Sequence, residues 1–253
     1  MVNGLKPARR AAGRTAVCEA ETRHSSRTTR PSRMMPAVGA TEEALLSLAR
    51  VVEQRDNHTA GHCERLAFTG VTLGVEMRLE SKHLLSLYLG GYLHDVGKVG
   101  LPDSILFKSD HLTKDEWDMM RTHPERGEEI CRPLRSLAHV LPIIRHHHER
   151  LDGSGYPDRL SGADIPLLAR VLQVVDIYDA LTNTRPYKEA YSRAKALDIL
   201  EEEADRGWRD REITALFVRM HKRMHGKIAD YKPSDAPASM GKSLSNLQSF
   251  LAQ

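Results

Sequence analysis

The chain has 253 residues, of which 40% are hydrophobic and 5% aromatic, enough for one large domain and a tail. Its formal net charge is +3, but residues 1–40 hold eight Lys and Arg against two Glu, so the rest is slightly acidic and we expect no DNA or RNA partner. No apolar run approaches the roughly 20 residues of a membrane span, and no apolar signal core stands near the N-terminus, which predicts a soluble, unsecreted protein. Three widely spaced cysteines form neither a disulfide framework nor a CxxC metal site, in keeping with a reducing cytoplasm.

Residues 1–40 are predicted to form a basic, disordered tail, because they are rich in Arg, Ser and Thr without sustained helical periodicity. A solvated tail is one interpretation; a transit peptide, or a segment that binds a partner or an anionic membrane, is another. Helical structure is predicted from Thr41, an N-cap followed by Glu42 and Glu43 in the first turn.

Residues 41–230 are predicted to form one helical domain. Residues 45–52 and 167–181 repeat apolar side chains at helical spacing, and residues 81–96 are apolar almost throughout, as in a buried helix. Residues 112–130 begin with a helix-start pattern and are expected to turn Trp117, Met120 and Ile130 inward. Since no alternating strand pattern of convincing length occurs, the sequence predicts an all-α bundle.

Residues 231–253 are interpreted as a linker and a C-terminal helix, in which Leu244, Leu247, Phe250 and Leu251 recur at helical spacing. This helix either packs on its own domain or contacts a second subunit, which would make the protein a homodimer.

Histidines recur next to buried segments. His58 and His62 are four residues apart, so both are expected on one face of a helix, although two surface histidines would give the same pattern. His94 and Asp95 end the apolar stretch 81–96, where burying an imidazole beside a carboxylate is costly unless a charged partner is present. This pair is therefore predicted to bind a metal ion.

Further candidate ligands follow along the chain. His123 precedes a proline and could equally be an ordinary helix-end residue. His147 and His148 follow an apolar segment, and neighbours about 100° apart on a helix can serve two different ions. Asp176 lies inside an apolar helix, either as a ligand or as a buried acid paired with an arginine, while Asp179 could orient a ligand or cap a turn.

The number of these residues exceeds what one ion requires. Imidazole and carboxylate ligands without thiolate favour iron, manganese or zinc, and shared carboxylates suit two or more ions about 3.5–4 Å apart. Such a cluster lowers the pKa of a bound water and stabilises the attacking and leaving oxygens of a phosphoester. The pattern therefore predicts phosphodiester hydrolysis.

Five segments carry a resemblance to a known family: "RDNHTAGHCERLA", "HDVGKVGLPDSIL", "RTHPERG", "HHERLDGSGYPDRLSGADIP" and "RVLQVVDIYDALTNTRPYK". In order and spacing they resemble the HD-GYP family, bacterial phosphodiesterases of cyclic di-GMP within the HD phosphohydrolases. The resemblance covers about residues 41–230 and implies a cytoplasmic bacterial enzyme.

The resemblance also implies roles for individual residues. The metal ligands it indicates are His62, His94, Asp95, His123, His147, His148 and Asp176. Asp95 would bridge two ions and act in catalysis. Position 58 varies in the family, so the presence of His58 does not decide whether the site binds two or three metal ions. Iron or manganese is expected, with zinc, nickel or cobalt as alternatives, and the extra His146 has no family role.

For the substrate, Lys98 resembles the active-site lysine near the scissile phosphate. Arg185 and Lys188 resemble the pair that binds the other phosphate, although cations at a helix C-terminus would look the same. Gly155, Tyr156 and Pro157, with the nearby Gly153, would shape the loop that walls the site.

The expected product is linear pGpG, with GMP after a second round in some relatives and cyclic GMP-AMP as the substrate of others. Two other functions remain: a phosphohydrolase of another nucleotide, and a non-catalytic receptor of cyclic di-GMP. Many relatives carry an N-terminal receiver or sensor domain, whereas here only the basic tail is seen, so the signalling partner is unknown.

Overall fold

The computed structural model describes residues 39–55, 61–108, 110–184 and 189–224. Within these ranges the chain forms helices and no strand, apart from an isolated bridge between Asp152 and Ser161. The predicted all-α fold is confirmed. The α-helices are α1 (Ala40–Arg55), α2 (His62–Glu76), α3 (Ser81–Leu93), α4 (Asp103–Leu106), α5 (Lys114–Met120), α6 (His123–Cys131), α7 (Leu141–His146), α8 (Leu167–Thr182), α9 (Arg193–Asp205) and α10 (Arg211–Arg223), with short 3₁₀ turns η1 (Val96–Gly100), η2 (Arg135–Leu137) and η3 (Gly162–Asp164).

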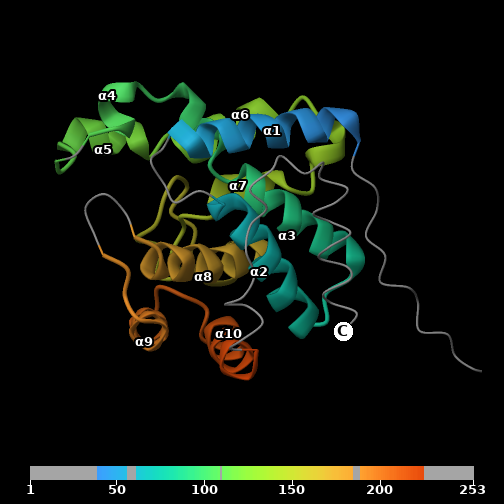
Figure 1. The fold of residues 1–253 in the computed structure, drawn as a ribbon, viewed down its shortest axis with the longest axis vertical. Coiled ribbons are helices and arrows are strands. Elements are labelled where there is room, and N and C mark those ends of the chain that lie inside the picture. The colour runs from blue at the N-terminus through green and yellow to red at the C-terminus, as the bar shows by residue number, and fades with distance from the viewer. Residues whose placement is uncertain (1–38, 56–60, 109, 185–188, 225–253) are drawn as a thin grey trace, which may run out of the picture. The chain divides into compact units, whose positions relative to one another are not determined.

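Helices α2, α3 and α8 form the centre of the bundle (Figure 1), with α1 and α6 on one side and α9 and α10 on the other. Almost every residue of α2 and of the second half of α3 is buried, because these helices are covered on several sides. Leu66 of α2, Leu87 of α3 and Leu172 of α8 are fully buried in the shared core. The apolar stretch predicted for residues 81–96 is therefore a central helix, and its end lies inside the molecule.

The region 112–130 departs from prediction. Thr113 caps α5 in a capping box with Glu116, as the helix-start pattern predicted, but the segment forms two helices that divide at Arg121 and Thr122. Trp117 is 46% exposed, so the expectation that it turns inward was wrong. Since α5 has no buried residue, this short helix lies on the surface and does not face the core.

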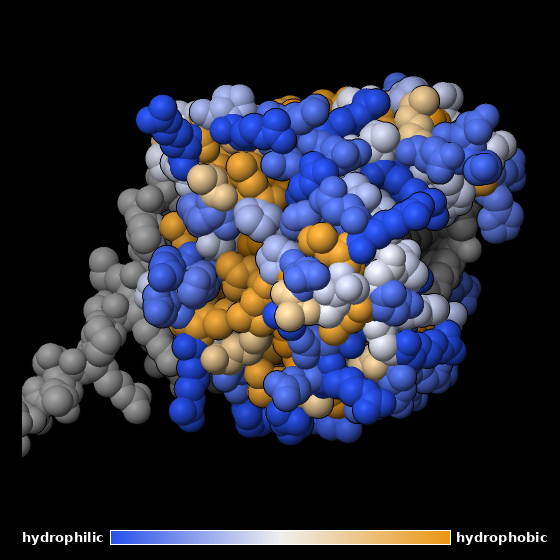
Figure 2. All heavy atoms as spheres, turned by 180° about the vertical axis from the view of Figure 1, so that it is seen from behind, coloured by the Kyte–Doolittle hydropathy of each residue, from blue (hydrophilic) through white to orange (hydrophobic). Residues whose placement is uncertain are grey.

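The first helix and α8 agree with prediction more closely. The first helix begins at Ala40, one residue before the predicted N-cap Thr41, and α8 spans the predicted 167–181. Asp210 caps α10, whose Ile213 and Phe217 face the core. On the face seen in Figure 2, charged and polar side chains predominate around an area where apolar side chains gather.

Some predictions lie outside the described residues. These are the N-terminal tail up to residue 38 and the C-terminal helix within 225–253, so the proposed domain limits at 40, 230 and 253 stay predictions. Over the ranges that the structure describes, no helix combines the length and apolar character needed to cross a membrane.

Candidate metal centre

The end of α3 brings His94 and Asp95 into the middle of the bundle. His94 follows the last residue of α3 and is 1% exposed, and the chain then turns through η1, which carries Lys98. The Nζ atom of Lys98 lies 2.8 Å from Oδ2 of Asp95. Gly97 lets η1 approach α6 closely, because a Cβ atom there would collide with the carbonyl oxygen of His123 and the backbone nitrogen of Gly127.

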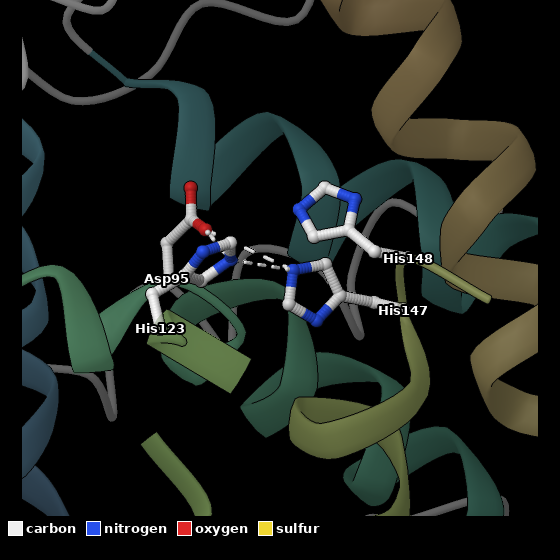
Figure 3. Close-up of side chains that lie close together, drawn as sticks. All are labelled: Asp95, His123, His147 and His148. Atoms are coloured by element: carbon white, nitrogen blue, oxygen red, sulfur yellow. Dashed lines mark hydrogen bonds and ion pairs between the residues drawn. The ribbon is translucent and has the colours of Figure 1, made fainter. Parts of the chain in front are cut away.

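Four side chains from three parts of the chain converge next to this turn (Figure 3). Asp95 meets His123 from the start of α6, and His147 and His148 from the end of α7. One ligand atom from each residue lies within 4.8 Å of the others. We call this set the His123 cluster. The four side chains point toward one another, an arrangement typical of a metal site.

The hydrogen bonds of the histidines decide which atoms face inward. His123 Nδ1 lies 2.8 Å from the carbonyl oxygen of Met120, and His147 Nδ1 lies 2.8 Å from that of Ile144. Each Nδ1 therefore carries the proton and donates it to the backbone, which leaves a lone pair on each Nε2. These two Nε2 atoms are 3.3 Å apart.

The same cluster contains a carboxylate oxygen that needs a partner. Oδ1 of Asp95 lies 3.2 Å from His123 Nε2 and 3.8 Å from His147 Nε2, and within the described part of the chain it accepts no hydrogen bond. Two imidazole nitrogens and Oδ1 of Asp95 thus face one another in a buried place. Lys98 contacts the other carboxylate oxygen, Oδ2, so a cation between the three inward-facing atoms would give them the partner they lack. The residues present therefore fit a metal ion. Burial holds the pKa values of His147 and His148 well below the usual range, which keeps these rings neutral and suited to ligation.

A second cluster uses the other oxygen of Asp95. His94 Nε2 lies 3.2 Å from Asp95 Oδ2, and the rings of His94 and His62 are 5.4 Å apart. Asp176, on α8, lies with its Oδ1 3.6 Å from Nε2 of His62. Together His62, His94 and Asp95, with Asp176 beside them, form the His62 cluster. Asp95 belongs to both clusters, so its carboxylate stands between two groups of imidazoles.

Asp179 holds His62 in place. Its Oδ2 accepts a hydrogen bond from His62 Nδ1 at 2.7 Å, and its Oδ1 accepts one from Arg65 Nε at 2.6 Å. Burial alone would raise the pKa of Asp179, but these donors outweigh burial and lower it to about 2. With Nδ1 of His62 bonded to a carboxylate, Nε2 is directed toward Asp176, the arrangement by which a carboxylate fixes the tautomer of a metal-binding histidine. The sequence suggested that Asp179 orients a ligand, and the geometry fits that role.

The loop after α7 closes over the His123 cluster. The ring of Tyr156 stacks on that of His148, with centroids 4.8 Å apart and 26° between the planes. Gly155 is required for this approach, because a Cβ atom there would collide with the backbone of Glu149 and Arg150. Tyr156 is largely buried, and burial raises the pKa of its hydroxyl.

Glu149 secures the same loop and was missed by the sequence analysis. Its side chain is 0% exposed, and its two carboxylate oxygens accept hydrogen bonds from the backbone N–H groups of Asp158 and Leu160. Nothing in the neighbouring sequence indicates this role, because a glutamate that follows three histidines is expected to be an ordinary solvent-exposed acid. Arg65 was missed for a similar reason, since its partner Asp179 lies 114 residues away along the chain.

The extra histidine has its own surroundings. Nδ1 of His146 is buried and makes no hydrogen bond among the described residues, and it lies 3.4 Å from Oδ2 of Asp158. Asp158 is itself bonded to Arg145 through both oxygens, at 2.6 and 2.7 Å. His146 thus contacts a salt bridge and lies outside both clusters.

Three of the predicted site residues are not among those that the structure describes. The helix α2 begins at His62, after Gly61, whose φ of 83° is left-handed, and His58 lies before the described range, so the prediction that His58 and His62 share a helix face stays a prediction. His147 and His148 each offer a ligand atom to the His123 cluster, and their ring centroids are 4.1 Å apart; the suggestion that such neighbours can serve two different ions stays a prediction. His58, Arg185 and Lys188 lie outside the described residues.

Residues 47–213 match the family model described as HD domain. The chain belongs to the HD domain family. Its resemblance to the HD-GYP group is likewise confirmed, because similar proteins include the cyclic di-GMP phosphodiesterase response regulator RpfG of Xanthomonas campestris, 39% identical over 177 residues. That match covers 69% of this HD domain protein and 47% of RpfG. A 3′3′-cGAMP-specific phosphodiesterase 2 of Vibrio cholerae is 40% identical over 153 residues, covering 60% of this chain and 29% of the other.

The HD domain chain thus spans about half, or less, of the length of these curated relatives. Among solved structures, a cyclic GMP-AMP-specific phosphodiesterase of Vibrio cholerae has a TM-score of 0.61 at 21% identity, covering 81% of this chain and 53% of that one. At this identity the likeness bears on the fold alone. The His/Asp clusters are consistent with the metal centre of an HD domain.

Proposed function

We propose that this protein is a metal-dependent phosphodiesterase that hydrolyses cyclic di-GMP to linear pGpG. The observation that carries the proposal is that two groups of imidazoles meet on the single carboxylate of Asp95, with acceptor atoms facing one another. A shared carboxylate between two ligand sets is typical of two-metal phosphoesterases. The relatives named above as cyclic dinucleotide phosphodiesterases supply the substrate class.

In this proposal the ligands divide between two divalent ions. The seven ligands are His62, His94, Asp95, His123, His147, His148 and Asp176. Asp95 would be shared between the two ligand groups, since its Oδ1 faces the His123 cluster and its Oδ2 faces His94. His58 would add a ligand for a third ion. Iron and manganese suit this set of nitrogen and oxygen donors, which contains no thiolate.

The ions supply a nucleophile from water at neutral pH and neutralise charge on the phosphoester. The protein's own side chains position the reaction. Asp179 keeps His62 oriented, and Lys98 holds Oδ2 of Asp95 at 2.8 Å while placing an ammonium group beside the reacting phosphate. Tyr156 stacks on His148 and limits the movement of that ring.

Substrate contacts extend beyond the described residues. Arg185 and Lys188 are proposed to bind the second phosphate of the cyclic dinucleotide, for which a guanidinium offers two parallel N–H donors. Gly155 and Pro157 hold Tyr156 in the loop that forms the wall of the site.

The test is hydrolysis of cyclic di-GMP by protein purified without oxygen and loaded with Fe(II) or Mn(II), with the products separated by chromatography. Asp95→Asn is the matched variant, because it keeps the shape of the side chain and removes the bridging charge. We expect pGpG from the wild type and loss of product from the variant. No product from wild-type protein of confirmed metal content would refute the proposal.

Cyclic GMP-AMP is the second candidate substrate, because the relatives divide between the two cyclic dinucleotides by name. Equal amounts of each should therefore be offered in competition. Preferential loss of cyclic GMP-AMP would favour the second candidate, whereas tight binding of cyclic di-GMP without turnover would indicate a receptor.

A further inference from the structure

A pocket of about 420 Å³ opens beside Tyr156. Its volume falls in the range of small-molecule sites, about 300–1,000 Å³. The loop 153–159 forms one part of its lining, and Arg121 and Glu125, near the junction of α5 and α6, form another. We infer that this pocket receives one guanine base of the cyclic dinucleotide and that Arg121 selects that base. The inference rests on the proposed function and adds a determinant of specificity to it.

The pocket is next to the metal centre. Tyr156 stacks on His148 of the His123 cluster, and it also lines the pocket, so the two places share this ring. In a cyclic dinucleotide, each ribose carries a base and is bonded to both phosphates. A base therefore has to lie close to the phosphate being cleaved, and the pocket offers an adjacent space for it.

Arg121 supplies the donors that guanine requires. Its guanidinium carbon lies 5.6 Å from the centre of the Tyr156 ring, and its nearest carboxylate, that of Asp118, is 3.9 Å away. Among the described residues, no hydrogen bond ties this guanidinium to another group. An arginine can donate two parallel hydrogen bonds to O6 and N7 of guanine, while the aromatic ring beside it offers a surface for the base.

Carboxylates complete the recognition. Asp118 is 58% exposed, and Glu125 is 46% exposed with its Oε1 3.5 Å from Arg145. Both line the pocket, where they can accept from the N1–H and amino groups of guanine. Adenine has an amino group where guanine has O6, so it would turn a donor toward the donors of Arg121. The pocket therefore favours guanine.

The first test compares kcat/KM for cyclic di-GMP and cyclic di-AMP in the metal-loaded protein. Arg121→Gln should lower the ratio of the two values by about 5- to 150-fold, the range expected for loss of one two-pronged contact to a base. Arg121→Lys keeps the charge but not the fork, and it should lose most of the same selectivity. Arg132→Gln is the control, because Arg132 also lies at α6 but is exposed and paired with Glu128.

The second test uses the two unequal phosphodiester bonds of 3′3′-cyclic GMP-AMP. If guanine occupies the pocket, one of these bonds lies at the metal centre, and one linear product predominates. In Arg121→Gln the two linear products should approach equal amounts. This ratio does not depend on how much of the variant is folded.

A base-free ester, bis(4-nitrophenyl) phosphate, separates the two proposals. Metal-dependent hydrolysis of this ester should persist in Arg121→Gln, because the metal centre is intact. If wild type cleaves the dinucleotides but Arg121→Gln alters neither the guanine preference nor the product ratio, the guanine pocket is refuted and the phosphodiesterase stands. If metal-loaded wild type cleaves no cyclic dinucleotide, the proposed function fails first.

Discussion

Asp179 offers the sharpest test of how the metal centre is supported. In Asp179→Asn, an NH2 group, which donates and does not accept, replaces one carboxylate oxygen, and the negative charge is lost, although the shape of the side chain is kept. His62 and Arg65 then compete for the one remaining oxygen, so the hydrogen bond that holds the proton on His62 Nδ1 is weakened. His62 can then protonate Nε2, the atom that faces Asp176, and lose its lone pair there. Removal of such a supporting group lowers metal affinity by about 10- to 100-fold. That corresponds to about 1.4–2.8 kcal/mol.

The variant also loses stability, because Arg65 bonds to the same carboxylate at 2.6 and 3.0 Å. Breaking a buried ion pair costs about 3–5 kcal/mol. Arg65→Met separates the two effects, since it removes the arginine and leaves the contact between Asp179 and His62. We expect Arg65→Met to lower Tm while its affinity for Mn(II) stays within a few-fold of wild type.

The assay is competition for Mn(II) with a chromophoric chelator, alongside thermal unfolding of the metal-free protein. Asp205→Asn serves as control, because Asp205 is 72% exposed and its pair with Arg211 belongs to the class of surface bridges that contribute little. If Asp179→Asn binds Mn(II) as tightly as the control does, the carboxylate does not orient His62, and the reasoning is wrong.

Three further predictions follow from the loop, the metal centre and the core. Gly155→Ala should destabilise the protein by about 1–3 kcal/mol and raise KM, because the new methyl group pushes the loop away from Glu149. Urea unfolding and steady-state kinetics, with Ser154→Ala as the control, measure the loss of stability and the rise in KM. Equal stability and equal KM in the two variants would contradict the prediction. Removal of metal by a chelator should lower Tm, since ligand at 100 times its Kd stabilises by about 2.7 kcal/mol; a Tm that does not respond to added Mn(II) would argue against the centre. Cys131 is 0% exposed, and burial raises its pKa to about 11. At pH 8 iodoacetamide should therefore modify Cys131 only after the protein unfolds, which peptide mass spectrometry measures. Rapid labelling of Cys131 in the native protein would contradict its burial.

Most of the candidate metal-binding residues could be picked out from the sequence because they lie at or next to the end of a helix, whereas Asp176 lies inside α8. A histidine or an aspartate at such a place is carried inward with the helix, as His94 and Asp95 are by α3. The helical character of residues 81–96 and 167–181 was readable for the same reason, since local periodicity records which face is buried. Trp117 is the exception, because the sequence of a short helix does not show whether another element packs against it. Trp117 was predicted to be buried and is exposed.

The helical class, the family and the set of chemical groups could be predicted from the sequence, because they depend on residues near one another along the chain. Which of these groups come into contact depends on the folded arrangement. Only folding brings Asp179 to His62 across 117 positions, closes Tyr156 onto His148, and places both oxygens of Asp95 between separate sets of imidazoles. Such contacts depend on the packing of helices that are distant in sequence, and no local pattern encodes the distance between them.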